Sequence, residues 1–272
     1  AVVAASTVTA NGFRTKTNNT THLTINVDSS PKAFIRGGSN ESVSIGITSY
    51  PATSSGITGN TVIGSFAGTD MVTGVDNVLI GVDAAEHYEG DFSVIIGGLS
   101  ITQWQSLTGE AFSKNVVIGE GTGATNLGSG NAATWMTMLG AETDITGGNG
   151  NYEYSIALGA KAEIKASHQW VAGSTLGYLT EAYFGRGVTG ISPATFTLNA
   201  TGGSGLNNAG AGFVLAAGKS TGNATPASIF LATSTAAGSS STLQTLSNRF
   251  QLNGTGQLLA LNGSSFGTLT LV

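Results

Sequence analysis

The densest group of side chains that could do chemistry is a short run of acids with one histidine. Asp83, Glu86, His87, Glu89 and Asp91 follow one another closely in the sequence. Carboxylate and imidazole groups are the ligands that zinc and hard divalent cations take in proteins. Charged residues also keep a loop solvated and prevent neighbouring β-edges from pairing. We expect the solvated loop and no bound metal, with a cation site in the first four of these residues as the alternative.

The other polar residues do not form a catalytic pattern. His22, His87 and His168 are dispersed, and no spacing typical of a Ser/His/Asp triad is present. Glu86 and Glu89 could serve as the paired carboxylates of a glycosidase. Such an enzyme usually has a longer groove lined with aromatic side chains. We therefore expect no enzyme activity and no cofactor.

Tryptophan side chains in two insertions are candidates for binding. Trp104 lies between Gln103 and Gln105, and Trp135 lies near the end of the next insertion. Aromatic rings beside amide donors suit contacts with sugars, and loops held on a rigid scaffold often carry binding. The alternative is that the rings fill space between identical chains. We favour this packing role for Trp135 and leave both roles open for Trp104. The predicted receptor or glycan contact consists of Gln103, Trp104, Gln105 and Trp135.

A four-residue apolar cluster that ends in glycine recurs along the middle of the chain. The clusters are at 43–46, 61–64, 78–81, 94–97, 116–119, 137–140, 156–159 and 170–173. Each predicts one short strand, and a recurrence of this kind is typical of the rungs of a solenoid. The repeat therefore predicts strands stacked one per rung.

The residues at the two ends of each cluster predict its corners. The first seven terminal glycines are Gly46, Gly64, Gly81, Gly97, Gly119, Gly140 and Gly159. Glycine permits a positive φ or a close backbone approach, so we expect it at a corner. The residue before the cluster is Asn or Ser in six of the eight cases, and such a side chain can bond to its own backbone to start a turn.

The residue pattern within the expected strands predicts which of their faces are covered. In 78–80, 94–96 and 116–118 all three residues are apolar. Because successive side chains of a strand point to opposite faces, this pattern predicts strands that are covered on both sides.

The repeat resembles a known family. The sequences NTVIG at 60–64, NVLIG at 77–81 and SIALG at 155–159 are similar to the head repeat of trimeric autotransporter adhesins, which also occurs in phage tail fibres. The resemblance covers residues 41–177 and implies a left-handed parallel β-roll with three copies packed around a common axis. Met136, where the repeat has Asn, departs from the pattern.

The segments before and after the repeat have different sequence patterns. Residues 178–272 predict a second β-rich domain with strands at 196–199, 213–217, 228–233, 248–252, 257–261 and 268–271. This segment resembles the shaft region of phage tail-fibre and side-fibre proteins. Residues 1–40 predict an N-terminal β cap or connector, with strands at 22–27 and 33–36.

The composition indicates how such a chain could be stabilised. It has 41 glycines, 9% charged residues, a net charge of −5 and no cysteine. Disulfides are excluded, no basic stripe for nucleic acid is present, and no apolar run is long enough to cross a membrane. Small side chains bury little apolar area within one chain, so we expect identical chains to share a core.

Together these features predict an all-β protein: a left-handed parallel β-roll followed by a second β-rich fibre domain, assembled as a homotrimer. The expected role is a structural and adhesive segment of a phage tail fibre in the virion, giving rigid extension and host attachment. Expected partners are copies of itself, other fibre or baseplate proteins, and a host surface glycan or protein. The alternatives are a self-assembling extracellular or capsid-surface filament subunit and a cell-surface adhesin head.

Overall fold

The computed structural model describes two compact units, residues 1–182 and 183–272. The residues that it describes are 21–27, 30–37, 42–47, 49, 56–101, 112–123, 131–146, 151–184, 189, 195–235, 238 and 242–262. These residues form strands and turns, with almost no helix. The all-β prediction is therefore confirmed.

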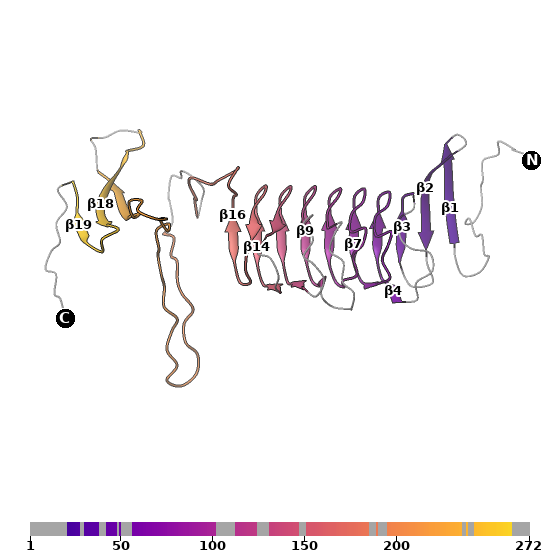
Figure 1. The fold of residues 1–272 in the computed structure, drawn as a ribbon, viewed down its shortest axis with the longest axis horizontal. Helices are drawn as coiled ribbons and strands as arrows, with labels where there is room; N and C mark the ends of the chain where they lie inside the picture. The colour runs from indigo at the N-terminus through magenta and orange to yellow at the C-terminus, as the bar shows by residue number, and fades with distance from the viewer. Residues whose placement is uncertain are drawn as a thin grey trace, which may run out of the picture. The chain divides into compact units, whose positions relative to one another are not determined.

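The first unit is a parallel β-solenoid, as predicted (Figure 1). Each of the eight apolar clusters is a strand: β3 (Val43–Ile45), β5 (Thr61–Ile63), β7 (Val78–Ile80), β8 (Val94–Ile96), β9 (Val116–Ile118), β11 (Thr137–Leu139), β14 (Ile156–Leu158) and β16 (Trp170–Ala172). They pair in chain order, parallel and without a shift in register, so equivalent residues of successive rungs lie side by side. The hand of the roll stays a prediction.

Other strands form further sides of the rungs and one end of the sheet. Three parallel pairs join β4 (Gly56–Thr58) to β6 (Thr73–Val75), β10 (Ala133–Thr134) to β13 (Tyr152–Glu153), and β12 (Asp144–Ile145) to β15 (Glu163–Ile164). The N-terminal strands β1 (Thr21–Val27) and β2 (Ser30–Gly37) form an antiparallel hairpin, and β2 also pairs with β3. The N-terminal hairpin thus continues the same sheet.

The core of the roll is filled by the middle residue of each repeat strand. Val62, Leu79, Ile95 and Val117 are fully buried, whereas Val78 and the other flanking residues face outward and are partly exposed. One chain therefore covers only one side of strands that were predicted to be covered on both. The outward side is partly exposed in the single chain.

The corner glycines stack into a column. Their φ angles lie between 102° at Gly159 and 152° at Gly46, a region that other residues rarely adopt. A Cβ built on Gly81 would lie 2.5 Å from the carbonyl oxygen of Gly97 in the next rung, and the glycines from Gly46 to Gly140 share this close approach. Rungs can stack at this corner because no side chain separates them.

The Asn and Ser residues before the strands form a second column, which we call the polar ladder. Asn77 N donates to Asn60 Oδ1 at 2.8 Å, and Ser93 N donates to Asn77 Oδ1 at 2.9 Å. The Asn77 amide also donates to the carbonyl of Gly90 at 2.7 Å. The predicted bonds to the local backbone also form: the side chains of Asn60, Ser93 and Ser155 each donate to the carbonyl two residues earlier. The sequence prediction missed the second contact, which joins one rung to the next.

The polar ladder has one interruption, at the residue that departs from the repeat. It runs from Ser42 through Asn60, Asn77, Ser93 and Asn115, and Met136 N donates to Asn115 Oδ1 at 3.0 Å. The Met136 side chain offers no oxygen to the next rung. The pattern resumes at Ser155, whose Oγ accepts from Gln169 N at 3.0 Å.

Tyr88 crosses the interior of the roll and makes its stability sensitive to alkaline pH. The side chain is fully buried, and its hydroxyl lies 2.6 Å from Ser93 Oγ and within hydrogen-bonding distance of the Phe112 carbonyl. Burial raises the pKa of Tyr88 above its ordinary value because the anion would be desolvated. The neutral phenol is therefore favoured in the folded state.

This raised pKa predicts a loss of stability above the pKa of tyrosine in the unfolded chain. Since only the unfolded state releases this proton, the free energy of unfolding should fall by up to about 1.4 kcal/mol per pH unit above about pH 10. Tyr88→Phe should remove that contribution and cost about 1 kcal/mol at pH 7 through the lost hydrogen bond. Chemical denaturation of both proteins at pH 7 and between pH 9 and 11 checks this, and equal slopes would contradict it.

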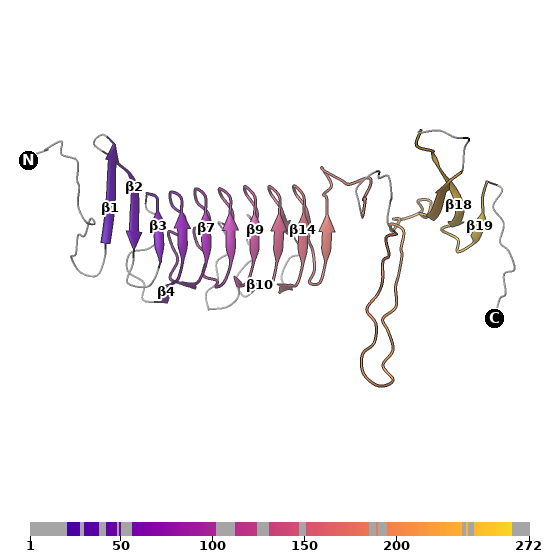
Figure 2. The same ribbon diagram turned by 180° about the vertical axis from the view of Figure 1, so that it is seen from behind.

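The second unit contains a small antiparallel sheet and a long arm. The sheet consists of β17 (Ile229–Ser234), β18 (Leu246–Leu252) and β19 (Leu258–Ala260), close to three of the predicted strands. The predicted strands at 196–199 and 213–217 instead lie in an extended arm, residues 195–228, that contains no strand (Figure 2). A strand requires a ladder of backbone bonds, and among the described residues the two sides of the arm are joined only locally, where Ala211 N donates to the Thr201 carbonyl at 2.8 Å. The segment 268–271 lies outside the described residues.

Candidate interaction surfaces

The outward side of the eight parallel strands is an uncharged, largely apolar surface, which we call the outer face. It consists of the first and third residue of each strand, and its most exposed apolar members include Val43 (45%), Ile63 (37%), Val116 (37%), Ile118 (38%), Leu139 (37%) and Ile156 (40%). The first positions otherwise hold Thr, Val or Trp, and the third positions hold Ile, Leu or Ala. Contiguous apolar surfaces are typical of interaction sites.

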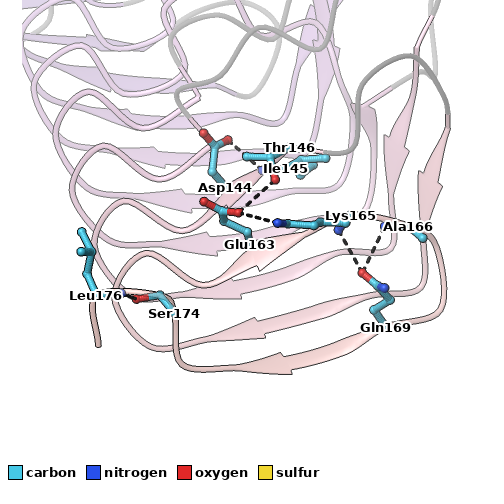
Figure 3. Close-up of polar contacts among 9 residues, drawn as sticks. All are labelled: Asp144, Ile145, Thr146, Glu163, Lys165, Ala166, Gln169, Ser174 and Leu176. Atoms are coloured by element: carbon cyan, nitrogen blue, oxygen red, sulfur yellow. Dashed lines mark hydrogen bonds and ion pairs between the residues drawn. The ribbon is translucent and has the colours of Figure 1, made fainter. Parts of the chain in front are cut away.

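Charged residues of the roll lie on its turns and short strands instead. Lys161 Nζ pairs with Glu142 Oε2 at 2.5 Å, and Lys165 Nζ pairs with Glu163 Oε2 at 3.2 Å. Glu163 also accepts from Thr146 Oγ1 at 3.2 Å (Figure 3). These contacts join neighbouring parts of the last rungs, and they leave the outer face free of charge.

The arm of the second unit also exposes apolar side chains. They are Phe196 (51%), Leu198 (64%), Leu206 (89%), Phe213 (56%), Val214 (86%) and Leu215 (60%). Lys219 is the only charged residue between 195 and 235. The arm, like the outer face, is suited to burial against an uncharged surface.

A third surface is formed by the residue that precedes each polar-ladder position. In four successive rungs it is Lys114, Trp135, Tyr154 and His168, which we call the aromatic column; all four have positive φ. Lys114 Nζ lies 5.0 Å from the Trp135 ring centroid, Trp135 stacks on Tyr154 at 6.0 Å and 13°, and Tyr154 contacts His168 at 5.4 Å and 31°. Aligning the rungs in the sequence could have found this column.

The column changes the role expected of Trp135. Lys114 comes from the rung before it and Tyr154 from the rung after, so both faces of the indole are occupied within the chain. The ring is nevertheless 51% exposed, so its edge faces solvent. Trp135 therefore offers an edge, not a free face, to a ligand. Trp104, Gln103 and Gln105, predicted with it, lie outside the described residues.

The structure places only two residues of the acidic run, Glu86 and His87, in one group of possible metal ligands. Ligand atoms of Asp70, Glu86 and His87 lie within 4.8 Å of one another, and His87 Nδ1 is 2.9 Å from Asp70 Oδ2. Asp83 and Glu89 do not belong to this group, although burial raises the pKa of the Glu89 carboxyl. Among the described residues no other three such side chains come close enough to share a cation.

The sequence prediction missed Asp70, and the repeat explains how it could have been found. Asp70 lies six residues after Gly64, and His87 lies six residues after Gly81. Equivalent positions of consecutive rungs stack, so the two side chains meet. Together with Glu86 they could hold a divalent cation, but a surface contact between His87 Nδ1 and the Asp70 carboxylate accounts for the same geometry.

We expect this surface contact without a metal. Surface pairs contribute about 0–1 kcal/mol, so His87→Ala should change the free energy of unfolding by no more than that. Adding EDTA should leave the thermal midpoint of the parent protein unchanged. A chelator that lowers the midpoint of the parent, but not that of His87→Ala, would identify these residues as metal ligands.

Compared with family models, with curated proteins and with solved structures, the chain matches none of them. Among the described residues no helix has the length and apolar character needed to cross a membrane.

Proposed function

We propose that this chain is a segment of a homotrimeric fibre, in which the β-roll gives rigid extension and the assembly attaches to a surface. The observation that carries the proposal is the outer face: eight in-register strands expose Val, Ile and Leu with no charged residue among them. Identical chains can cover one another there without leaving a buried charge. The exposed apolar arm supports the same kind of association.

Three copies and a phage tail-fibre setting follow from the resemblance of the repeat and of the C-terminal segment to fibre proteins. The mechanism in this proposal is passive. Rungs stacked by the glycine column and the polar ladder keep the roll straight and stiff. Three copies of each contact surface then bind through multivalency, so weak individual contacts give firm attachment. Other virion proteins and a host surface molecule would be the partners.

Charges placed on the outer face test this proposal. Val94 and Ile96 are partly buried outward residues of β8, and the Val94→Lys/Ile96→Lys double variant leaves the buried Ile95 in place. Burying unpaired ammonium groups costs several kcal/mol, so the trimer should weaken at least about tenfold. The matched control is Val82→Lys, at a turn residue that is 55% exposed. Sedimentation velocity at micromolar concentration reports the change.

Two results would overturn the assignment of this surface. One is a double variant that keeps the parent mass at every concentration. The other is a control that dissociates as readily as the double variant. Circular dichroism of each variant verifies that the roll remains folded. Negative-stain images add a check, because polymers of indefinite length would favour a self-assembling filament over a trimeric fibre.

A further inference from the structure

We propose that the aromatic column is a binding strip for an acidic polysaccharide. This inference rests on the proposed attachment function and names the class of ligand. Each member of the column precedes the first outward residue of a strand by two positions, so the column follows one margin of the outer face. The rim of an interface stays accessible when its centre is buried. A ligand can therefore reach the column in the assembled fibre.

The four side chains present a row of hydrogen-bond donors. Lys114 ends in an ammonium group, Trp135 in an indole N–H, Tyr154 in a hydroxyl and His168 in a ring N–H. None of these side-chain groups makes a hydrogen bond to a residue that the structure describes. Trp135 and Tyr154 are 51% and 55% exposed. The row is thus held in place by ring contacts while its donors remain available.

The charge and regular spacing of the row indicate the ligand. It carries a fixed positive charge and no carboxylate of its own, so it favours a chain rich in anionic acceptors. Successive rungs of a parallel sheet lie about 4.8 Å apart, which suits a linear polymer whose acceptors repeat along its length. Asp76, two rungs before Lys114 in the same series of positions, places a carboxylate beyond the row.

The occupied ring faces distinguish a polysaccharide from a nucleic acid. Proteins that bind single-stranded nucleic acid stack bases on free aromatic faces. Here Lys114 and Tyr154 cover the two sides of Trp135. Binding to a duplex would require many more phosphate contacts from basic residues than this row supplies. Uronic-acid or sulfated sugars need only donors and positive charge along an edge.

The test uses the full chain and variants that remove donors while preserving the stack. Trp135→Phe and Tyr154→Phe keep an aromatic ring, and Lys114→Gln removes the charge. Binding to alginate and heparin, measured by biolayer interferometry, should be at least tenfold weaker for the triple variant than for the parent. Neutral dextran should not bind either protein. Tyr178→Phe and Lys161→Gln, which change an exposed ring and a cation outside both the column and the outer face, are the controls and should bind as the parent does.

Several outcomes would overturn the proposal. They are a parent that binds neither acidic polymer, a parent that binds dextran or single-stranded DNA as well as alginate, and controls that lose binding as the triple variant does. Sedimentation of every variant separates this proposal from the fibre assignment. A trimer that binds no acidic polysaccharide overturns only the binding strip, whereas a monomeric parent overturns the proposed function. A triple variant that changes mass would show instead that copies of the chain cover the column.

Discussion

Gly97→Ala is expected to destabilise the roll strongly, whereas Gly98→Ala, at the next residue, should leave it almost unchanged. Gly97 has a φ of +144°, and a Cβ there would lie 2.5 Å from the carbonyl carbon of Gly119 and 2.7 Å from Ser100 Oγ. Neither the backbone angle nor the stacked carbonyl can adapt without separating two rungs. The loss in free energy of unfolding should be at least about 3 kcal/mol.

Gly98 is the matched control for this prediction. The nearest atom to a Cβ there is the Val82 carbonyl oxygen at 3.6 Å, an ordinary contact. Gly98→Ala should change the free energy of unfolding by about 0.5 kcal/mol or less. Chemical denaturation of the two variants and the parent measures the difference. Equal losses at the two positions would show that the glycine column does not set the rung spacing.

Asn77→Ala is expected to have the second large effect, because Asn77 joins two rungs from inside the roll. The substitution removes the acceptor of Ser93 N, at 2.9 Å, and the donor to the Gly90 carbonyl, at 2.7 Å. Asn77 is completely buried, so water does not replace either bond. Two unsatisfied buried groups cost about 2–5 kcal/mol together.

Asn77→Ser provides the comparison, since Ser93 and Ser155 occupy the same position in their own rungs and accept from the rung that follows. The serine variant should keep an acceptor and lose about half as much stability as the alanine variant. Hydrogen exchange gives a local readout: the Ser93 amide should exchange faster in Asn77→Ala than in Asn77→Ser. Identical exchange in both variants would contradict the role of the polar ladder.

The repeat predicted the first unit well because each rung has the same physical problem. A strand needs a β-favouring middle residue such as Leu79 to fill the interior, and its corner needs a glycine such as Gly81 to let rungs approach. Both requirements leave a pattern in the sequence. The bonds that Asn accepts from the next rung left no such pattern. The same residue type suits a side chain that bonds to its own turn and one that bonds to the neighbouring rung.

Contacts between rungs were predicted less well. Asp70 and His87 are 17 residues apart and meet only because the rungs stack in register. The ring contacts of Trp135 have the same origin, since Lys114 and Tyr154 belong to neighbouring rungs. Proximity along the sequence grouped Asp83 and Glu89 with His87, whereas the structure brings Asp70 to it. Alignment of equivalent rung positions gives the right neighbours.

The second unit shows the limit of strand prediction from local pattern. Strands close to 228–233 and 248–252 form because β17 and β18 pair with each other. The apolar runs at 196–199 and 213–217 are similarly apolar, but they form no strand with any residue that the structure describes. Their exposed Leu198 and Val214 side chains are accounted for if partners come from other copies.

Association of the chain with itself is the central claim, and the mass of the full chain in solution tests it most directly. Native mass spectrometry or sedimentation equilibrium at micromolar concentration should give three times the chain mass of 27.2 kDa. A stable, folded monomer at that concentration would contradict the claim, because the outer face and the arm would then remain uncovered.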